Sequence, residues 1–330
     1  GSGAIDFKAG GFAGGGGPAT AARLNSPSGL AMDGRGNLFI ADAGNHRIRM
    51  VDAATGIIST VVGSGPGGVA SGAFSGDAGL AAAARLSFPE GLAIASDGSL
   101  YIADSINDRI RRVDARTAVI TTVAGTGASG RAAPVSGDGG PATSARLDHP
   151  SAVAFDVDGN LLVVEEGSGR IRKIALGSGV ITTRAGREKS GLSGAGFSGD
   201  GGPAAAARLS SPAGLALDTG GNLLFVDLGN NRIRHVALPG GIITTAVGTG
   251  RPGFAGDGGP AITAELQYPT EIAVDSDGNL FIADSSNNRI RRVSIATGHI
   301  ATVAGSGSPG WGKGSFSGDG GPATNATLNL

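Results

Sequence analysis

Short apolar runs separated by turn residues recur along the whole chain. After Pro269 the runs TEIAVD (residues 270–275), NLFIAD (279–284), RIRRVSI (289–295) and HIATVAG (299–305) are separated by SDG, SSNN and ATG. Runs of this length bounded by Gly, Asn and Asp are typical of β-strands joined by tight turns. The pattern predicts a four-stranded antiparallel meander. We expect the first strand, which is the most uniformly apolar, at a crowded inner position.

The third run occurs five times, as NHRIRMV, NDRIRRV, SGRIRKI, NNRIRHV and NNRIRRV. The period of roughly 60 residues is in the range of propellers and repeat arrays, and four strands make one propeller blade. We predict one all-β propeller domain over residues 1–330, with five complete blades. The predicted blades span residues 25–63, 87–125, 148–186, 210–248 and 267–305. The first arginine of each third run is expected to be a structural ion-pair partner: Arg47, Arg109, Arg170, Arg232 and Arg289.

Glycine-rich linkers join the blades, and they contain near-copies of FSGDGGPAT, the sequence at residues 316–324. The Pro and the Ala-rich run that follows predict a short helical turn, with Pro141 at a first helical position. A leucine ends each linker and is expected to pack downward: Leu24, Leu86, Leu147, Leu209, Leu266 and Leu328.

The acidic residue of this linker motif has a functional and a structural interpretation. Glycine-rich loops with a carboxylate can bind a cation or hold a phosphate. We favour a structural role, in which glycines supply positive φ and the aspartate caps the helical turn. The first copy, FAGGGGPAT, has Gly15 in place of the acid, and the loop aspartates are Asp77, Asp138, Asp200, Asp257 and Asp319.

The number of fourth strands does not match the number of blades. Strand four and its linker occur six times, starting with AIDFKAG at Ala4–Gly10, but the three strands before it occur only five times. The sequence therefore predicts either a five-bladed ring or an incomplete six-bladed ring. An orphan strand could add to a strand edge of another copy, because unpaired edges invite pairing.

Two stretches identify a family resemblance. GLAMDGRGNLFIADAGNHRIRMV (Gly29–Val51) and EIAVDSDGNLFIADSSNNRIRRV (Glu271–Val293) strongly resemble NHL repeats. The linker motif resembles the extended bacterial form of that family. The resemblance covers nearly the whole chain and implies a β-propeller, but it implies little about chemistry, because one fold hosts many functions.

Composition excludes several classes of protein. The net charge is -1, so neither nucleic acid nor an anionic membrane is an expected partner. There is no cysteine, and no apolar run reaches the ~20 residues of a membrane helix. Aromatic residues make up 4%, which argues against ligand recognition by stacked rings. We expect an extracellular or cell-surface location for a secreted bacterial protein.

A second set of acidic residues precedes the repeated arginines. Propeller symmetry would bring them together around a channel, where they could bind calcium or another divalent cation; alternatively they accept hydrogen bonds in the turn. We favour the interpretation in which these residues accept hydrogen bonds in the turn, and no cofactor is expected. The candidates are Asp42, Asp104, Glu165, Asp227 and Asp284. The four histidines occupy different places in the repeat, which argues against one shared site.

Two functions are consistent with these features. The first is a non-catalytic extracellular scaffold that binds a protein partner or self-associates through the terminal strand. The alternative is a propeller enzyme of the lyase or lactonase type with a carboxylate-held metal. Glu165 and Glu166 favour the alternative, because this blade alone loses the Asn turn and gains a carboxylate.

Overall fold

The computed structural model describes residues 12–65, 72–128, 136–187, 196–238, 240–307 and 316–329. These residues form strands and short 3₁₀ turns, with no α-helix among them. Five antiparallel sheets follow one another along the chain, each built on four strands, and the first also includes the two-residue strand β1 (Gly17–Pro18). This confirms the predicted all-β propeller class with five complete blades. The strand predicted at Ala4–Gly10 lies outside the described residues.

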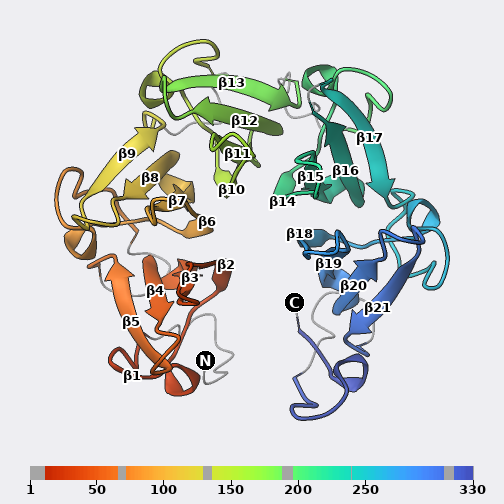
Figure 1. Cartoon of the computed structure of the whole chain (residues 1–330), viewed down its shortest axis with the longest axis horizontal. Helices are drawn as coiled ribbons and strands as arrows, with labels where there is room; N and C mark the ends of the chain where they lie inside the picture. Colours follow the sequence, from red (N-terminus) through yellow and green to blue (C-terminus); the bar gives the residue numbers. More distant parts are fainter. Residues whose placement is uncertain are drawn as a thin grey trace. The chain divides into compact units, whose positions relative to one another are not determined.

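The five sheets are blades 1 to 5 in chain order (Figure 1). Blade 1 comprises β2 (Pro27–Met32), β3 (Leu38–Asp42), β4 (Arg47–Val51) and β5 (Ile57–Val62). Blade 2 comprises β6 (Pro89–Ile94), β7 (Leu100–Asp104), β8 (Arg109–Val113) and β9 (Ile120–Ala124). Blade 3 comprises β10 (Pro150–Phe155), β11 (Leu161–Glu165), β12 (Arg170–Ala175) and β13 (Val180–Ala185). Blade 4 comprises β14 (Pro212–Leu217), β15 (Leu223–Asp227), β16 (Arg232–Ala237) and β17 (Ile242–Val247). Blade 5 comprises β18 (Pro269–Val274), β19 (Leu280–Asp284), β20 (Arg289–Val293) and β21 (Ile300–Ala304).

The chain forms two compact units. The first comprises residues 1–168 and 172–182, and it holds blades 1 and 2 with most of blade 3. The second comprises residues 169–171 and 183–330, and it holds blades 4 and 5 with the last linker. The single domain over residues 1–330 stays a prediction.

The four strands of each blade lie in sequence order, and in blades 2 to 5 the first and fourth strands form the two edges of the sheet. In blade 1 the short β1 (Gly17–Pro18) pairs with β5 and takes the outer edge. The β7–β8 hairpin is representative, since Asp104 pairs with Arg109 and Ile102 with Arg111. A 3₁₀ turn closes this hairpin in four blades, although we expected helical turns only in the linkers. The residue that follows this turn is left-handed, as at Asp108 with φ 49°, a conformation that Asn, Asp and His tolerate better than most residues. The four turns are η2 (Ala43–Asn45), η4 (Ser105–Asn107), η7 (Leu228–Asn230) and η9 (Ser285–Asn287).

The linkers contain the short helical turns that the sequence predicts. They are η1 (Ala19–Ala21), η3 (Ala81–Ala83), η5 (Ala142–Ser144), η6 (Ala204–Ala206), η8 (Ala261–Thr263) and η10 (Ala323–Asn325). Pro141 precedes the turn in an extended conformation, with φ -61° and ψ 128°, and does not open it as we expected. The linker between blades 1 and 2 contacts both blades. Gly63 of blade 1 donates its N–H to Ala81 O, and Leu80 bridges to Val119 beside β9 of blade 2.

Within each unit, hydrophobic clusters lie between consecutive blades. Leu266, which is completely buried, packs with Ile233 of blade 4 and Ile282 of blade 5. The linker leucines Leu86, Leu147 and Leu209 are buried in the same way, while Leu24 and Leu328 are only partly buried.

The first strands are less uniformly buried than we expected. Leu92, Val153, Leu215 and Ile272 stand at equivalent positions and are 5–8% exposed. Leu30 at the same position of β2 is 60% exposed, and Met32 is 65% exposed. The expectation of a crowded inner position is therefore wrong for β2 among the described residues, since Leu30 and Met32 are exposed.

Candidate functional site

A buried arginine held between two carboxylates is the main polar feature of the blades. In blade 2 Arg111 comes from β8, and its side chain has no exposed surface. Its Nη1 lies 3.3 Å from Asp104 Oδ2, at the end of β7, and its Nη2 lies 2.7 Å from Asp77 Oδ1, in the preceding linker. The arginine therefore ties the linker to the blade that follows it.

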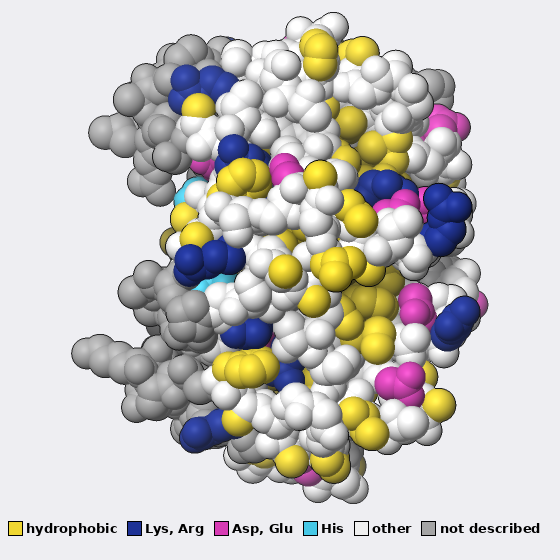
Figure 2. All heavy atoms as spheres, turned by 90° about the vertical axis from the view of Figure 1, so that its left-hand side faces the viewer, with side chains coloured by type: hydrophobic (Ala, Val, Ile, Leu, Met, Phe, Trp, Pro, Cys, Tyr) yellow, Lys and Arg dark blue, Asp and Glu magenta, His cyan; other side chains and the backbone are white. Residues whose placement is uncertain are grey.

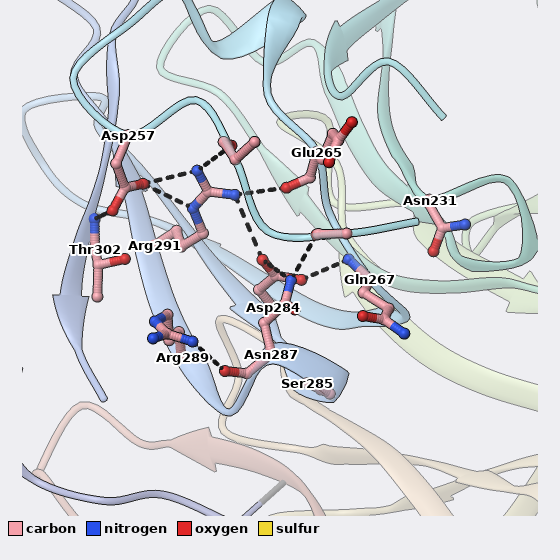
Figure 3. Close-up of polar contacts among 12 residues, drawn as sticks. Asn231, Asp257, Glu265, Gln267, Asp284, Ser285, Asn287, Arg289, Arg291 and Thr302 are labelled. Carbon is pink, nitrogen blue, oxygen red and sulfur yellow. Dashed lines mark hydrogen bonds and ion pairs between the residues drawn. The ribbon is translucent and has the colours of Figure 1, made fainter. Parts of the chain in front are cut away.

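Blade 5 shows the same arrangement in detail (Figure 3). Arg291 Nη2 lies 2.7 Å from Asp257 Oδ1, and Nη1 lies 3.5 Å from Asp284 Oδ2. The same guanidinium donates to the backbone carbonyls of Glu265 and Ala255, at 2.7 and 3.0 Å. Its Nε also donates to Asp257 Oδ1 at 3.1 Å, so all three nitrogen atoms are used, which is what a buried guanidinium requires to offset its lost hydration.

Blades 3 and 4 repeat the arrangement. In blade 4 Arg234 lies 3.0 Å from Asp227 and 2.6 Å from Asp200. In blade 3 Arg172 lies 3.0 Å from Glu165 and 2.7 Å from Asp138. Glu165, whose side chain is longer than that of the aspartate in the other blades, therefore forms the same ion pair.

The inner carboxylates also close the hairpin turn. Asp104 Oδ1 accepts the N–H of Ser87 at 2.7 Å, and its Oδ2 accepts from Asn107 Nδ2 at 2.8 Å. In blade 3, which lacks the Asn, Ser168 Oγ donates to Glu165 instead at 2.9 Å. Burial raises the pKa of Asp104 to about 6, although these hydrogen bonds and Arg111 act in the opposite direction.

The residues predicted as metal candidates all occupy this inner position. Asp42, Asp104, Glu165, Asp227 and Asp284 have side chains with no exposed surface, and each lies within ion-pair distance of an arginine of its own blade. These carboxylates are engaged in the turn, as in the structural interpretation, and metal binding by them stays a prediction.

The loop aspartates do not cap the helical turns, so that expectation is wrong. In none of the six linker turns does a side chain form a cap hydrogen bond. Asp77 instead accepts from Arg111 and from Thr122 Oγ1, which lies 2.7 Å from Asp77 Oδ2. Asp138, Asp200 and Asp257 contact arginine in the same way, whereas Asp319 follows blade 5 and is exposed.

The second arginine of each RIR run makes these ion pairs, whereas in blades 1, 2, 4 and 5 the first one donates to backbone carbonyls. Arg109 donates to Asn107 O at 3.1 Å and to Thr126 O at 2.7 Å. A linker phenylalanine covers both arginines: the Phe74 ring centre lies 3.8 Å from Arg109 Cζ and 4.7 Å from Arg111 Cζ. Phe12, Phe197 and Phe254 make the equivalent cation–π contacts in blades 1, 4 and 5.

The spacing of the RIR runs led us to expect the ion pairs at the first arginine of each run. The alternation of the strand indicates that both arginines share one face of the sheet, but it does not indicate which of them lies between the carboxylates.

Figure 2 shows hydrophobic, basic and acidic side chains interspersed over one side of the molecule, without one charge dominating it.

The structure brings together a cluster that the sequence did not predict. Ligand atoms of Asp108, Asp148 and His149 lie within 4.8 Å of one another, and this is the one such group among the described residues. The backbone N–H of His149 donates to Asp108 Oδ1 at 2.9 Å. Carboxylate and imidazole groups are ligands for several divalent metals. Asp108 and His149 lie 41 residues apart, so no local motif signals the cluster.

Glu90 in β6 is a second unpredicted feature. Burial and the nearby Glu166 carboxylate raise the pKa of Glu90 to about 7, against the lowering effect of a hydrogen bond with Ser105. A carboxyl group with a pKa in this range can exchange protons near neutral pH.

Comparison with known proteins agrees with this geometry. Residues 9–69 match the Teneurin NHL domain, and residues 266–293 match the NHL repeat. The chain belongs to the NHL-repeat family of β-propellers. NHL repeat-containing protein 2 of Gallus gallus is 30% identical over 306 residues, which cover 85% of this NHL chain and 40% of that protein. The chain therefore spans less than half the length of that relative.

Solved structures show the same fold at low sequence identity. A Bacteroides thetaiotaomicron protein of unknown function has a TM-score of 0.64 at 17% identity, covering 97% of this NHL chain and 66% of that chain. A putative gluconolactonase has a TM-score of 0.54 at 14% identity, with coverage of 92% and 90%. A chain of a nidogen–laminin complex has a TM-score of 0.53 at 18% identity, with coverage of 83% and 78%.

The described part of the NHL chain holds no helix of the length and apolarity that a membrane span requires.

Proposed function

We propose that this NHL propeller is a non-catalytic binding scaffold that associates through the exposed face of β2 in blade 1. The observation that carries the proposal is the 60% exposure of Leu30, whose equivalents in the other blades are 5–8% exposed. Large apolar side chains that lie next to one another on a sheet are typical of interaction surfaces. The repeated carboxylates are engaged in ion pairs with buried arginines, which supports a structural rather than a catalytic role for them.

The partner we propose for this surface is a blade of a second copy of the chain. In the first unit β2 packs beside β6, where Ser28 Oγ donates to Pro89 O at 3.3 Å. The equivalent of Leu30 in β6 is Leu92, and it is covered by blade 1. The free face of β2 thus has the composition of a surface that packs against another blade. The propeller solved in a nidogen–laminin complex supports a protein-binding role, and an extracellular or cell-surface location belongs to the same proposal.

Sedimentation velocity from low to high protein concentration tests this function. We expect the mass of the intact chain to rise with concentration, and the Leu30→Asp, Met32→Asp double variant to stay monomeric. Val157→Asp is the matched control, because Val157 is 76% exposed in a turn of blade 3. A chain that is monomeric throughout, or a double variant that associates as the parent does, would contradict the proposal. Deleting residues 1–10 tests in parallel whether the strand predicted there provides the contact.

An enzyme of the lyase or lactonase type is the second candidate function. The observation that favours it is the cluster of Asp108, Asp148 and His149, which places three metal-ligand side chains within reach of one ion. Stoichiometric divalent metal in the purified protein, lost on Asp148→Asn, would support this alternative. Metal-free protein that still associates through β2 would support the scaffold.

A further inference from the structure

Blade 1 lacks one of the two carboxylates that hold the buried arginine in the other blades. Its buried arginine is Arg49, and its linker has Gly15 where blades 2 to 5 have an aspartate. Arg49 retains the inner partner, because its Nη1 lies 3.6 Å from Asp42 Oδ2, and both side chains have no exposed surface. The outer partner is missing.

Two buried polar groups of blade 1 have no hydrogen bond to any described residue. Among the described residues no partner accepts from Nε, Nη1 or Nη2 of Arg49, and the hydroxyl of Thr60 is also without one. The equivalent arginines in blades 2 and 4, Arg111 and Arg234, leave only Nε without a partner. Burial lowers the pKa of Arg49, and Asp42 offsets this only in part.

Blades 2 and 4 show what Arg49 and Thr60 are placed to bind. Arg49 pairs with Thr60 across β4 and β5, as Arg111 pairs with Thr122 and Arg234 with Thr245. In blade 2 one oxygen of Asp77 accepts from Arg111 and the other from Thr122, both at 2.7 Å. In blade 4 Asp200 is held at 2.6 and 2.7 Å in the same way. Each of these arginine–threonine pairs therefore binds one carboxylate with both of its oxygens.

The backbone of the linker is the same in blade 1, so only the side chain differs. The Gly16 N–H donates to Ile58 O at 2.8 Å, as Ala78 does to Ile120 in blade 2. Gly14 and Gly76 both have a positive φ and lie against the alanine that follows their 3₁₀ turn. A Cβ built on Gly15 would meet no atom closer than Arg49 Nη2, at 3.9 Å. The loop thus has room for an acidic side chain and lacks one.

We propose that blade 1 binds an external carboxylate group between Arg49 and Thr60, in the place of the missing aspartate side chain. The carboxylate accepts from the guanidinium through one oxygen and from the Thr60 hydroxyl through the other. Phe12 borders this place, because its ring centre lies 4.6 Å from Arg49 Cζ. Access from solvent is expected, since the equivalent Asp77 and Asp200 side chains are 38% exposed.

Two sources can supply this chemistry, a free small acid or an acidic side chain of another polypeptide. A formate or acetate ion has the size of the missing group. A phosphate carries two oxygen atoms more than the aspartate carboxylate that fills the equivalent place in blade 2. The expected ligand is therefore a carboxylate.

Thermal unfolding in acetate tests the proposal, with chloride keeping the ionic strength constant. We expect the Tm of the parent chain to rise and saturate with acetate, because ligands of the folded state stabilise it. Gly15→Asp should raise the Tm without acetate and remove the response. The matched control is Asp77→Gly, which opens the same place in blade 2 and should add a second acetate response. Thr60→Val should weaken the response of the parent chain.

NMR of the arginine side chains gives a readout that is independent of stability. Acetate should shift the Nε–Hε signal of Arg49 in the parent chain, and that of Arg111 only in Asp77→Gly. A blocked peptide containing one aspartate, titrated in parallel, distinguishes the two sources. A shift by acetate assigns a small acid, and a shift by the peptide alone assigns an acidic side chain. No shift by either, or an equal acetate response in Gly15→Asp, overturns the proposal.

Discussion

Asp104 and Arg111 form an ion pair at 3.3 Å in which neither side chain has any exposed surface. Removing two charges from water costs more than an isolated pair regains, so such pairs persist only where further hydrogen bonds assist. Here Ser87 and Asn107 donate to the aspartate, and Asp77 binds the other side of the guanidinium. The pair therefore depends on the turn and on the linker together.

Asp104→Asn is expected to lower the free energy of unfolding by about 3 kcal/mol, because it leaves Arg111 buried with half of its counter-charge. Urea unfolding followed by fluorescence or circular dichroism measures the loss. The control is Asp77→Asn, which removes the outer partner of the same arginine. Asp77 is 38% exposed, so water replaces part of the lost contact and we expect about 1 kcal/mol. Equal losses in the two variants would show that burial does not decide the strength of this pair.

Leu266→Ala is expected to lower the free energy of unfolding by about 2–5 kcal/mol, because it opens a cavity in the core between blades 4 and 5. Leu266 is completely buried and packs with Ile233 and Ile282. Leu328 occupies the same place in the last linker but is only partly buried. Leu328→Ala should therefore cost much less in the same urea titration. A cost for Leu266→Ala as small as that for Leu328→Ala would mean that the linker leucines do not anchor the blades.

Gly29→Ala is expected to disturb the packing of β2 against β6. A Cβ on Gly29 would lie 2.1 Å from the backbone oxygen of Glu90 and 3.1 Å from Gly91 Cα, so the two strands must separate. We expect a loss of about 1–3 kcal/mol, typical of overpacking. Gly34→Ala is the control, since a Cβ there meets nothing within 4 Å. Hydrogen exchange of the β6 amides should increase in the first variant only, and unchanged exchange would contradict the close approach of the two strands.

Glu90 should make the stability of the protein depend on pH. The folded state raises the pKa of this carboxyl from 4.5 to about 7, so the folded state binds a proton more tightly than the unfolded chain does. The stabilisation that results is fully present below pH 4.5 and is lost as the pH rises through 7. Glu90→Gln, which resembles the protonated acid, should remain stable at pH 8 relative to the parent. Parallel unfolding titrations from pH 4 to pH 8 measure the difference between the two proteins. A difference that does not change over this range would contradict the raised pKa.

The sequence by itself determined the secondary structure, the number of blades and the class of the fold. Runs such as NLFIAD alternate between two faces and end at Asn, Asp or Gly, so strand and turn are specified within a few residues. The repeated spacing of the RIR runs then implies one blade per repeat, and the structure has those blades. The resemblance to NHL repeats follows from the same local motifs.

Only the tertiary structure decided which side chains meet. Asp77 and Arg111 are 34 residues apart, and Asp108 and His149 are 41 residues apart. Such pairs depend on how a linker crosses onto the next blade, which no local pattern encodes. The same is true of exposure, because Leu30 and Leu92 occupy the same place in their strands. Leu92 is buried because blade 1 packs against β6, whereas Leu30 is 60% exposed. The sequence shows that Gly15 replaces the acid of the linker motif, but only the structure shows the buried Arg49 and Thr60 that face this place without a hydrogen-bond partner among the described residues.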